Sequence, residues 1–258
     1  MKKVNLLFFV LVSCLSLTAC ISDSFDNEET TSGEGQFQLF VLNEEVQVED
    51  LTRAAEITVD VNSFKVNLKD AQGVSLISNK PYSDLQDGDR TLPSGVGYRI
   101  SVVSCSEAEA ISTNDGWGQA RFYGNETFDI VSDQTTPVTV SCSMENAGLM
   151  VIYDATFTSK FPTCAATTQD ARALVFKTST TDNVAYYNMP EATGEVPLRL
   201  TGSAGGWSDR IDMTKNIPLT KGKVTRLTVK YDENSGDINI EFDTDKDITE
   251  DSDDVTIE

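Results

Sequence analysis

The 258-residue sequence contains no histidine. Histidine is the most frequent general base in enzymes and the most frequent metal ligand, so its absence excludes Ser-His-Asp and Cys-His catalysis and the usual zinc centres. Carboxylates, lysines, tyrosines and cysteines are left as the only catalytic groups. We therefore expect a protein that is not an enzyme and that carries no metal ion or cofactor.

Basic residues are scarce, because 20 lysines and arginines stand against 41 aspartates and glutamates, for a formal net charge of −21. Nucleic acid and a bare anionic membrane surface are therefore poor partners. The acidic residues are concentrated in 23–34 and 243–258, where like charges repel and little apolar surface is available for burial. We expect these ends to be solvated tails around a folded region of about 200 residues.

A long membrane-spanning run is also lacking, since a helical span needs about 20 apolar residues. The run Val4–Leu17 is shorter and follows Lys2 and Lys3, which is typical of a secretory signal. Its end, Leu17-Thr18-Ala19-Cys20, resembles the lipobox of bacterial lipoproteins. The resemblance implies a signal peptide over 1–19, cleavage between Ala19 and Cys20, and a diacylglycerol on the Cys20 thiol. An ordinary cleaved signal is the alternative.

Removal of residues 1–19 takes away two lysines and no acid, which leaves 18 basic and 41 acidic residues and a formal net charge of −23. Residues 20–35 then form a lipidated N-terminus and a polar, acidic linker. Acidic residues soon after the lipidated cysteine resemble the export signal of Bacteroidetes-type lipoproteins. The resemblance implies a lipid anchor in the outer membrane with the protein facing the cell exterior; a mere spacer is the alternative.

Three cysteines, Cys105, Cys142 and Cys164, fall in the region expected to fold, and the first two end strand-like runs. An exported chain meets oxidising conditions, so one pair can close and one thiol stays odd. Cys105–Cys142 is the candidate disulfide. Buried free thiols are the alternative, because cysteine is a common core residue.

Short alternating runs between Gly, Pro, Asn and Asp predict strands in this region, and helical periodicity never extends beyond a turn or two. Examples are Phe37–Leu42, Phe64–Lys69 and the hairpin of Val224–Tyr231 with Ile238–Phe242. The pattern predicts an all-β protein. The best boundary is the hinge-like Met144–Gly148, so we expect two consecutive β-sandwich domains, 36–145 and 146–245, before an acidic tail, 246–258.

A series of short motifs keeps a characteristic order along about residues 35–245. After the lipobox and acidic spacer come Gly35–Leu39, Thr52–Ala54, Phe64–Val66, Leu92–Gly95 with Gly97–Ile100, and Phe122–Gly124 with Phe128–Val131. This order resembles a largely uncharacterised domain family of Bacteroidetes surface lipoproteins. That family is similar in layout to the fimbrillins, pilus subunits built of two transthyretin-like β-sandwiches. The resemblance implies a structural or accessory, adhesive subunit of a fimbria-like assembly.

In fimbrillins an arginine-specific protease cuts a few tens of residues after the lipidated cysteine and frees a groove for a strand of the next subunit. Arg53-Ala54 stands where such a cut is expected. The resemblance therefore implies processing at Arg53 and binding of other fimbrial-type subunits by strand addition. An uncut Arg53, with Phe37–Leu42 simply completing the fold, is the alternative.

Aromatic residues beside glycines offer a different function. Trp117, Tyr123 and Trp207 are candidates for flat platforms on which sugars stack. The corresponding hypothesis is a surface glycan-binding lipoprotein. Burial of these rings in the core is the alternative, because aromatic side chains in sandwiches are mostly core residues.

Overall fold

The computed structural model describes residues 33–43, 59–86, 90–179, 183–204, 210–232 and 238–243. Cys20, Arg53, Ala54 and Trp207 lie outside the described residues, as do 23–32 and 244–258 of the two acidic ends. The chain from Gly33 onward forms one compact unit. Among the described residues, no helix has the length and apolar character that a membrane crossing requires.

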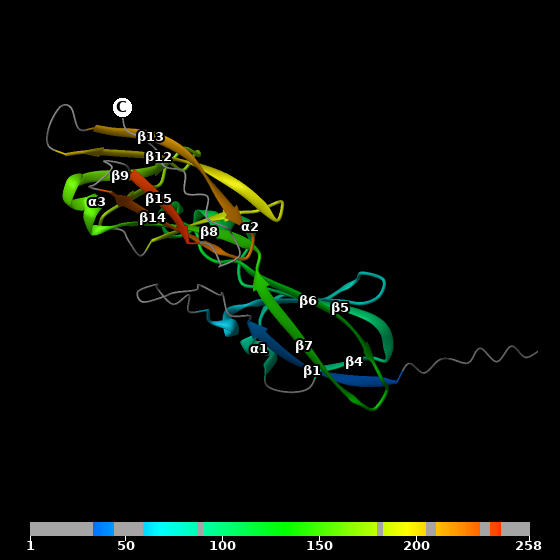
Figure 1. Ribbon diagram of the computed structural model, residues 1–258. Coiled ribbons are helices and arrows are strands. Elements are labelled where there is room, and N and C mark those ends of the chain that lie inside the picture. Colours follow the sequence, from blue (N-terminus) through cyan, green and yellow to red (C-terminus); the bar gives the residue numbers. More distant parts are fainter. Residues whose placement is uncertain are drawn as a thin grey trace, which may run out of the picture. The chain divides into compact units, whose positions relative to one another are not determined.

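Strands dominate the described residues, which confirms the expected β-rich fold (Figure 1). The strands are β1 (Glu34–Asn43), β2 (Lys65–Lys69), β3 (Ser75–Pro81), β4 (Arg90–Pro93), β5 (Gly95–Val103), β6 (Phe122–Ile130), β7 (Thr135–Met144), β8 (Asn146–Tyr153), β9 (Thr163–Thr168), β10 (Val175–Lys177), β11 (Val184–Asn188), β12 (Thr193–Ser203), β13 (Arg210–Thr220), β14 (Val224–Tyr231) and β15 (Ile238–Asp243). The helical segments are η1 (Val61–Ser63), α1 (Ser83–Gln86), α2 (Glu107–Ser112), η2 (Asn114–Gly116) and α3 (Ala155–Lys160).

The first half of the chain builds one seven-stranded sheet in the order β3-β2-β5-β6-β7-β1-β4. Alternation places the apolar side chains of these strands on a common face, where they form the first core cluster. Its buried members are Phe37, Leu39, Val41, Phe64, Val66, Leu68, Tyr82, Leu85, Tyr98, Ile100, Val102, Phe122, Phe128, Ile130, Val138, Val140, Cys142, Met144 and Tyr186. The last of these comes from β11, in the second half of the chain.

The second half forms two four-stranded sheets, β10-β9-β12-β13 and β11-β8-β14-β15. Their inner faces share a second core cluster built around residues such as Leu149, Phe157, Phe176, Ile217 and Leu227. The strand β8 is buried along nearly its whole length, as its continuous apolar run predicts. The predicted hairpin is also present, because β14 pairs antiparallel with β15.

Only Glu145 separates β7 from β8, so the expected hinge is an almost continuous strand. The Glu145 amide donates to the Arg121 carbonyl at 2.7 Å. The buried Asn146 side chain accepts from the Arg121 amide at 3.0 Å and donates to the Gln119 carbonyl at 2.8 Å. These bonds join the two halves, so a division into separate domains at 145 and 146 stays a prediction.

In the structure no disulfide joins the candidate pair, because Cys105, Cys142 and Cys164 are each present as cysteines outside any disulfide. Cys142 lies in β7, and Cys105 follows the end of β5, with β6 between these strands. Strands two apart in a sheet are separated by about 10 Å. A disulfide requires its Cα atoms within about 7 Å, so this topology keeps the two thiols apart.

Candidate functional site: the slot of the first strand

The strand β1 alternates strictly, with apolar side chains facing the first core. Phe37, Leu39 and Val41 are buried, whereas Phe40 and Leu42 are 41% and 54% exposed on the opposite face. Full burial of such side chains contributes about 1.5–3 kcal/mol each. The inner face of β1 is therefore an integral part of the core.

The two edges of β1 are covered to different extents. On one edge β1 pairs in parallel with β7 over eight residues, from Gln36 opposite Thr135 to Asn43 opposite Cys142, and Figure 1 shows the two strands side by side. On the other edge β4 pairs only with residues 34–37. We call the place of β1, between β7 on one edge and β4 with Tyr82 on the other, the β1 slot.

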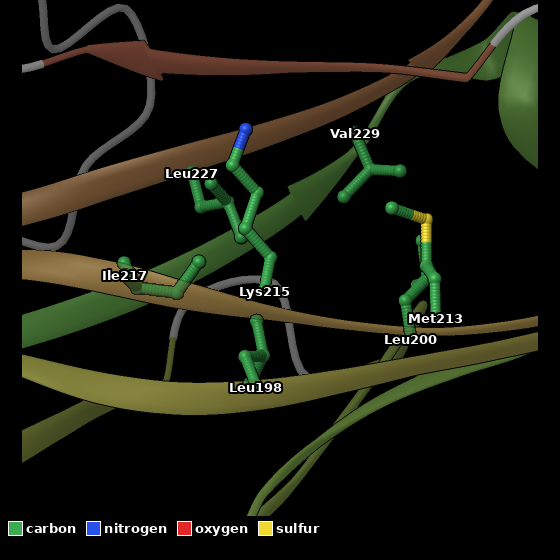
Figure 2. A pocket seen from close by; sticks show the side chains of 7 residues that line it. All are labelled: Leu198, Leu200, Met213, Lys215, Ile217, Leu227 and Val229. Carbon is green, nitrogen blue, oxygen red and sulfur yellow. The ribbon is translucent and has the colours of Figure 1, made fainter. Parts of the chain in front are cut away.

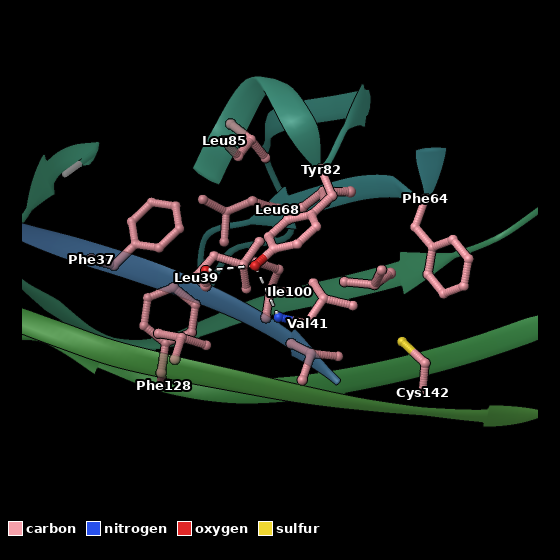
Figure 3. Close-up of a cluster of buried hydrophobic side chains, with 14 of the residues drawn as sticks. Phe37, Leu39, Val41, Phe64, Leu68, Tyr82, Leu85, Ile100, Phe128 and Cys142 are labelled. Carbon is pink, nitrogen blue, oxygen red and sulfur yellow. Dashed lines mark hydrogen bonds between the residues drawn. The ribbon is translucent and has the colours of Figure 1, made fainter. Parts of the chain in front are cut away.

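Tyr82 takes over the second edge where β4 ends (Figure 3). Its buried hydroxyl accepts a hydrogen bond from the Val41 amide at 3.3 Å and donates to the Leu39 carbonyl at 3.2 Å. The Tyr82 amide itself donates to the Phe64 carbonyl at 2.8 Å. The Tyr82 side chain thus supplies, at the centre of β1, the backbone hydrogen bonds that a neighbouring strand would otherwise make.

Tyr82 is a functional candidate that the sequence pattern misses. It follows β3 directly and precedes α1, whose Leu85 amide donates to the Tyr82 carbonyl at 2.8 Å. Its contacts lie 41 and 43 positions away along the chain. No local periodicity encodes a contact of that separation.

The predicted platform residue Trp117 is half-buried and packs against the second core, with its ring edge-on to Phe176 at a centroid distance of 4.9 Å. Gly116 and Gly118 have positive φ angles of 86° and 80°, which glycine adopts readily. The chain therefore turns sharply on both sides of Trp117. The structure therefore engages this ring in packing against the second core.

Of the other two aromatic candidates, Tyr123 is described by the structure and Trp207 is not. Tyr123 lies half-buried on β6, with the Arg121 guanidinium 5.8 Å from its ring centroid. Trp207 lies outside the described residues. Of the three predicted platform rings the structure describes two, and these lie in different surroundings, Trp117 against the second core and Tyr123 beside Arg121.

Arg172 is the second residue that the sequence pattern misses. Its guanidinium donates to the carbonyls of Gly116 at 3.2 Å and Tyr186 at 2.7 Å, and to Asp170 Oδ2 at 3.0 Å. It also lies 4.2 Å from the ring centroid of Tyr187. Burial raises the pKa of Tyr186 and that of Tyr187 to about 12. This cluster joins the loop that carries Trp117 to the second half of the chain.

A small apolar cavity lies between the sheets of the second half (Figure 2). Its lining residues are Leu198, Leu200, Met213, Lys215, Ile217, Leu227 and Val229. The centre of a water molecule has about 10 Å³ to move in, which is room for one water at most. Within the described ranges, no three acidic or cysteine side chains form a group that could hold a metal ion. Among the described residues, the β1 slot is therefore the stronger candidate for a functional site.

The fold and the slot define a β-rich protein whose first strand completes the first core cluster. Residues 33–258 match the family described as Domain of unknown function (DUF4493), and the chain belongs to this family. The match confirms the expected membership of an uncharacterised domain family.

The chain is similar to a fimbrial assembly protein from Parabacteroides distasonis, at 15% identity and a TM-score of 0.44, over 81% of this chain and 96% of that one. It is also similar to the fimbrial anchor protein Mfa2 from Porphyromonas gingivalis, at 10% identity and a TM-score of 0.40, over 81% of this chain and 97% of that one. No curated protein matches the chain.

Proposed function

We propose that this protein is a lipid-anchored, non-enzymatic subunit of the bacterial outer surface, and that its β1 slot accepts a strand of another subunit in a fimbria-like assembly. The observation that carries the proposal is the way β1 is held. It contributes three buried side chains to the core, yet beyond Phe37 the described strands flank it on one edge only.

The anchor in this proposal is a lipid on Cys20, which follows the secretory signal. Processing at Arg53 falls ten positions after the last residue of β1, Asn43. A cut there would leave β1 bound to the rest of the protein by non-covalent contacts alone. The strand could then leave together with the anchor.

An emptied slot is a strong receptor for a strand. The side chains of Val138, Val140 and Cys142 on β7 are buried in the first core cluster, together with those of β1. Loss of β1 would expose these apolar contacts and leave one edge of β7 without its partner. Main-chain hydrogen bonds to β7 would then supply affinity for an incoming strand, and the core would select apolar residues at alternate positions.

Mass spectrometry of the cell-surface form tests the anchor and the processing together. The expected result is a lipid on Cys20 and a fraction of molecules that begin at Ala54. Surface material that keeps an unmodified Cys20 would overturn the anchor, and material never cut at Arg53 would overturn the processing.

Strand capture is tested on full-length protein that folds first and is then cut at a specific protease site placed at Arg53-Ala54. A labelled peptide of residues 34–43 should replace β1 in the cut protein and not in the uncut one. The control peptide carries Leu39→Asp, which puts a charge at a buried position. Equal uptake of both peptides, or uptake of neither, would contradict the proposed slot.

A further inference from the structure

The backbone of β1 presents its hydrogen-bonding groups to both edges in turn. The Gln36 amide donates to the Gln134 carbonyl at 2.8 Å, so the peptide groups of the even-numbered residues of β1 face β7. Those of Phe37, Leu39 and Val41 face the opposite edge. At that edge β4 reaches only as far as Phe37.

Beyond Phe37, the Tyr82 hydroxyl lies between the Leu39 carbonyl and the Val41 amide and bonds to both. A buried backbone group without a partner costs free energy comparable to a lost hydrogen bond, so these two bonds hold the strand in place. A hydroxyl suits this position because it can donate and accept at once. Phenylalanine would fill the same space and make neither bond.

We propose that Tyr82 is the latch of the β1 slot, the positioning residue that holds β1 on the edge where, in the described part of the chain, β4 ends at Phe37. For a strand that replaces β1, the inference rests on the proposed function. Such a strand must present a carbonyl and, two residues later, a free amide to Tyr82. A proline at the position of Val41 has no amide hydrogen, so the latch selects against it.

Amide hydrogen exchange in the full-length protein tests the latch. Tyr82→Phe should speed exchange of the Val41 amide and of the Phe40 and Leu42 amides, which face β7, by about tenfold, since the strand leaves the slot as a unit. Amides of β5 in the same core should change by less than about twofold. This contrast separates a latch from a general loss of stability.

The matched control is Tyr153→Phe, because Tyr153 is equally buried in the second core cluster and its hydroxyl donates to the Phe176 carbonyl at 2.9 Å. This variant should leave exchange in β1 within about twofold of the unmodified protein. Three results would overturn the latch: unchanged exchange in Tyr82→Phe, faster exchange at Val41 alone, or equal acceleration in β1 and β5.

Peptide capture separates this inference from the proposed function. Fast β1 exchange in Tyr82→Phe, with no peptide uptake by the cut protein, would support the latch and overturn strand acceptance. Peptide uptake by the cut protein, together with unchanged β1 exchange in Tyr82→Phe, would support strand acceptance and overturn the latch. A peptide with an N-methyl group on Val41 should bind the cut protein about tenfold more weakly than the plain peptide, and this difference should vanish in Tyr82→Phe.

Discussion

The Tyr186 amide donates a hydrogen bond to the Trp117 carbonyl at 2.8 Å, and the two rings enter opposite cores. Tyr186, from the second half of the chain, belongs to the first core cluster. Trp117, from the first half, packs against the second. The halves therefore exchange aromatic side chains across their junction, which explains why the chain from Gly33 onward is one compact unit.

Trp117→Ala should lower the free energy of unfolding by about 2 kcal/mol, less than full burial would give, because the ring is half-buried. Urea unfolding followed by circular dichroism measures the change. Trp117→Phe keeps an aromatic ring near Phe176 and should recover most of the loss. An unchanged urea midpoint in Trp117→Ala would contradict the packing role.

Arg172→Lys should destabilise the protein by about 1–3 kcal/mol, because a lysine cannot reproduce the planar fork that reaches two carbonyls and Asp170. The shift in melting temperature reports it. Arg199→Lys is the matched control, since Arg199 pairs with Asp212 in an exposed ion pair, which contributes little. Equal effects of the two substitutions would count against Arg172 as the junction residue.

Acid should weaken the same junction. Burial alone would raise the pKa of Asp170, but hydrogen bonds from Thr168 and Arg172 outweigh it and hold that pKa below its ordinary value. Because the pKa is lower in the folded state, the stabilisation is complete above the unfolded value of about 3.9 and is lost as pH falls through the folded value. Urea midpoints between pH 7 and pH 2.5 should decline below about pH 4, and less steeply in Asp170→Asn.

Lys215 should protect an edge of the second half. It lies on β13, at the end of its sheet, and its side chain lines the small cavity beside Leu227 (Figure 2). An inward-pointing charge on an edge strand discourages pairing with another chain. Lys215→Ile should therefore make the protein associate with rising concentration in light-scattering measurements. Lys223→Ile, the same change in the turn before β14, should stay monomeric, and equal association of both variants would refute the edge role.

The alternation of apolar and polar residues along the sequence is sufficient to predict several of the strands. The alternation in β1, the buried run of β8 and the hairpin of β14 with β15 all follow from the period of two in side-chain direction. The helix α2 does carry a local signal, the capping box of Ser106 and Glu109 at its start, but strand periodicity does not reveal it. Short helices of this kind lack the length at which helical periodicity becomes visible.

The sequence by itself determined the β-rich class and the inward face of β1, because each depends on residues that are neighbours along the chain. Only the tertiary structure decided that Tyr82 closes the open edge of β1, that Arg172 and Trp117 join the two halves, and that Cys105 stays apart from Cys142. These contacts depend on strand order, and strand order brings together residues whose separation along the chain carries no local signal.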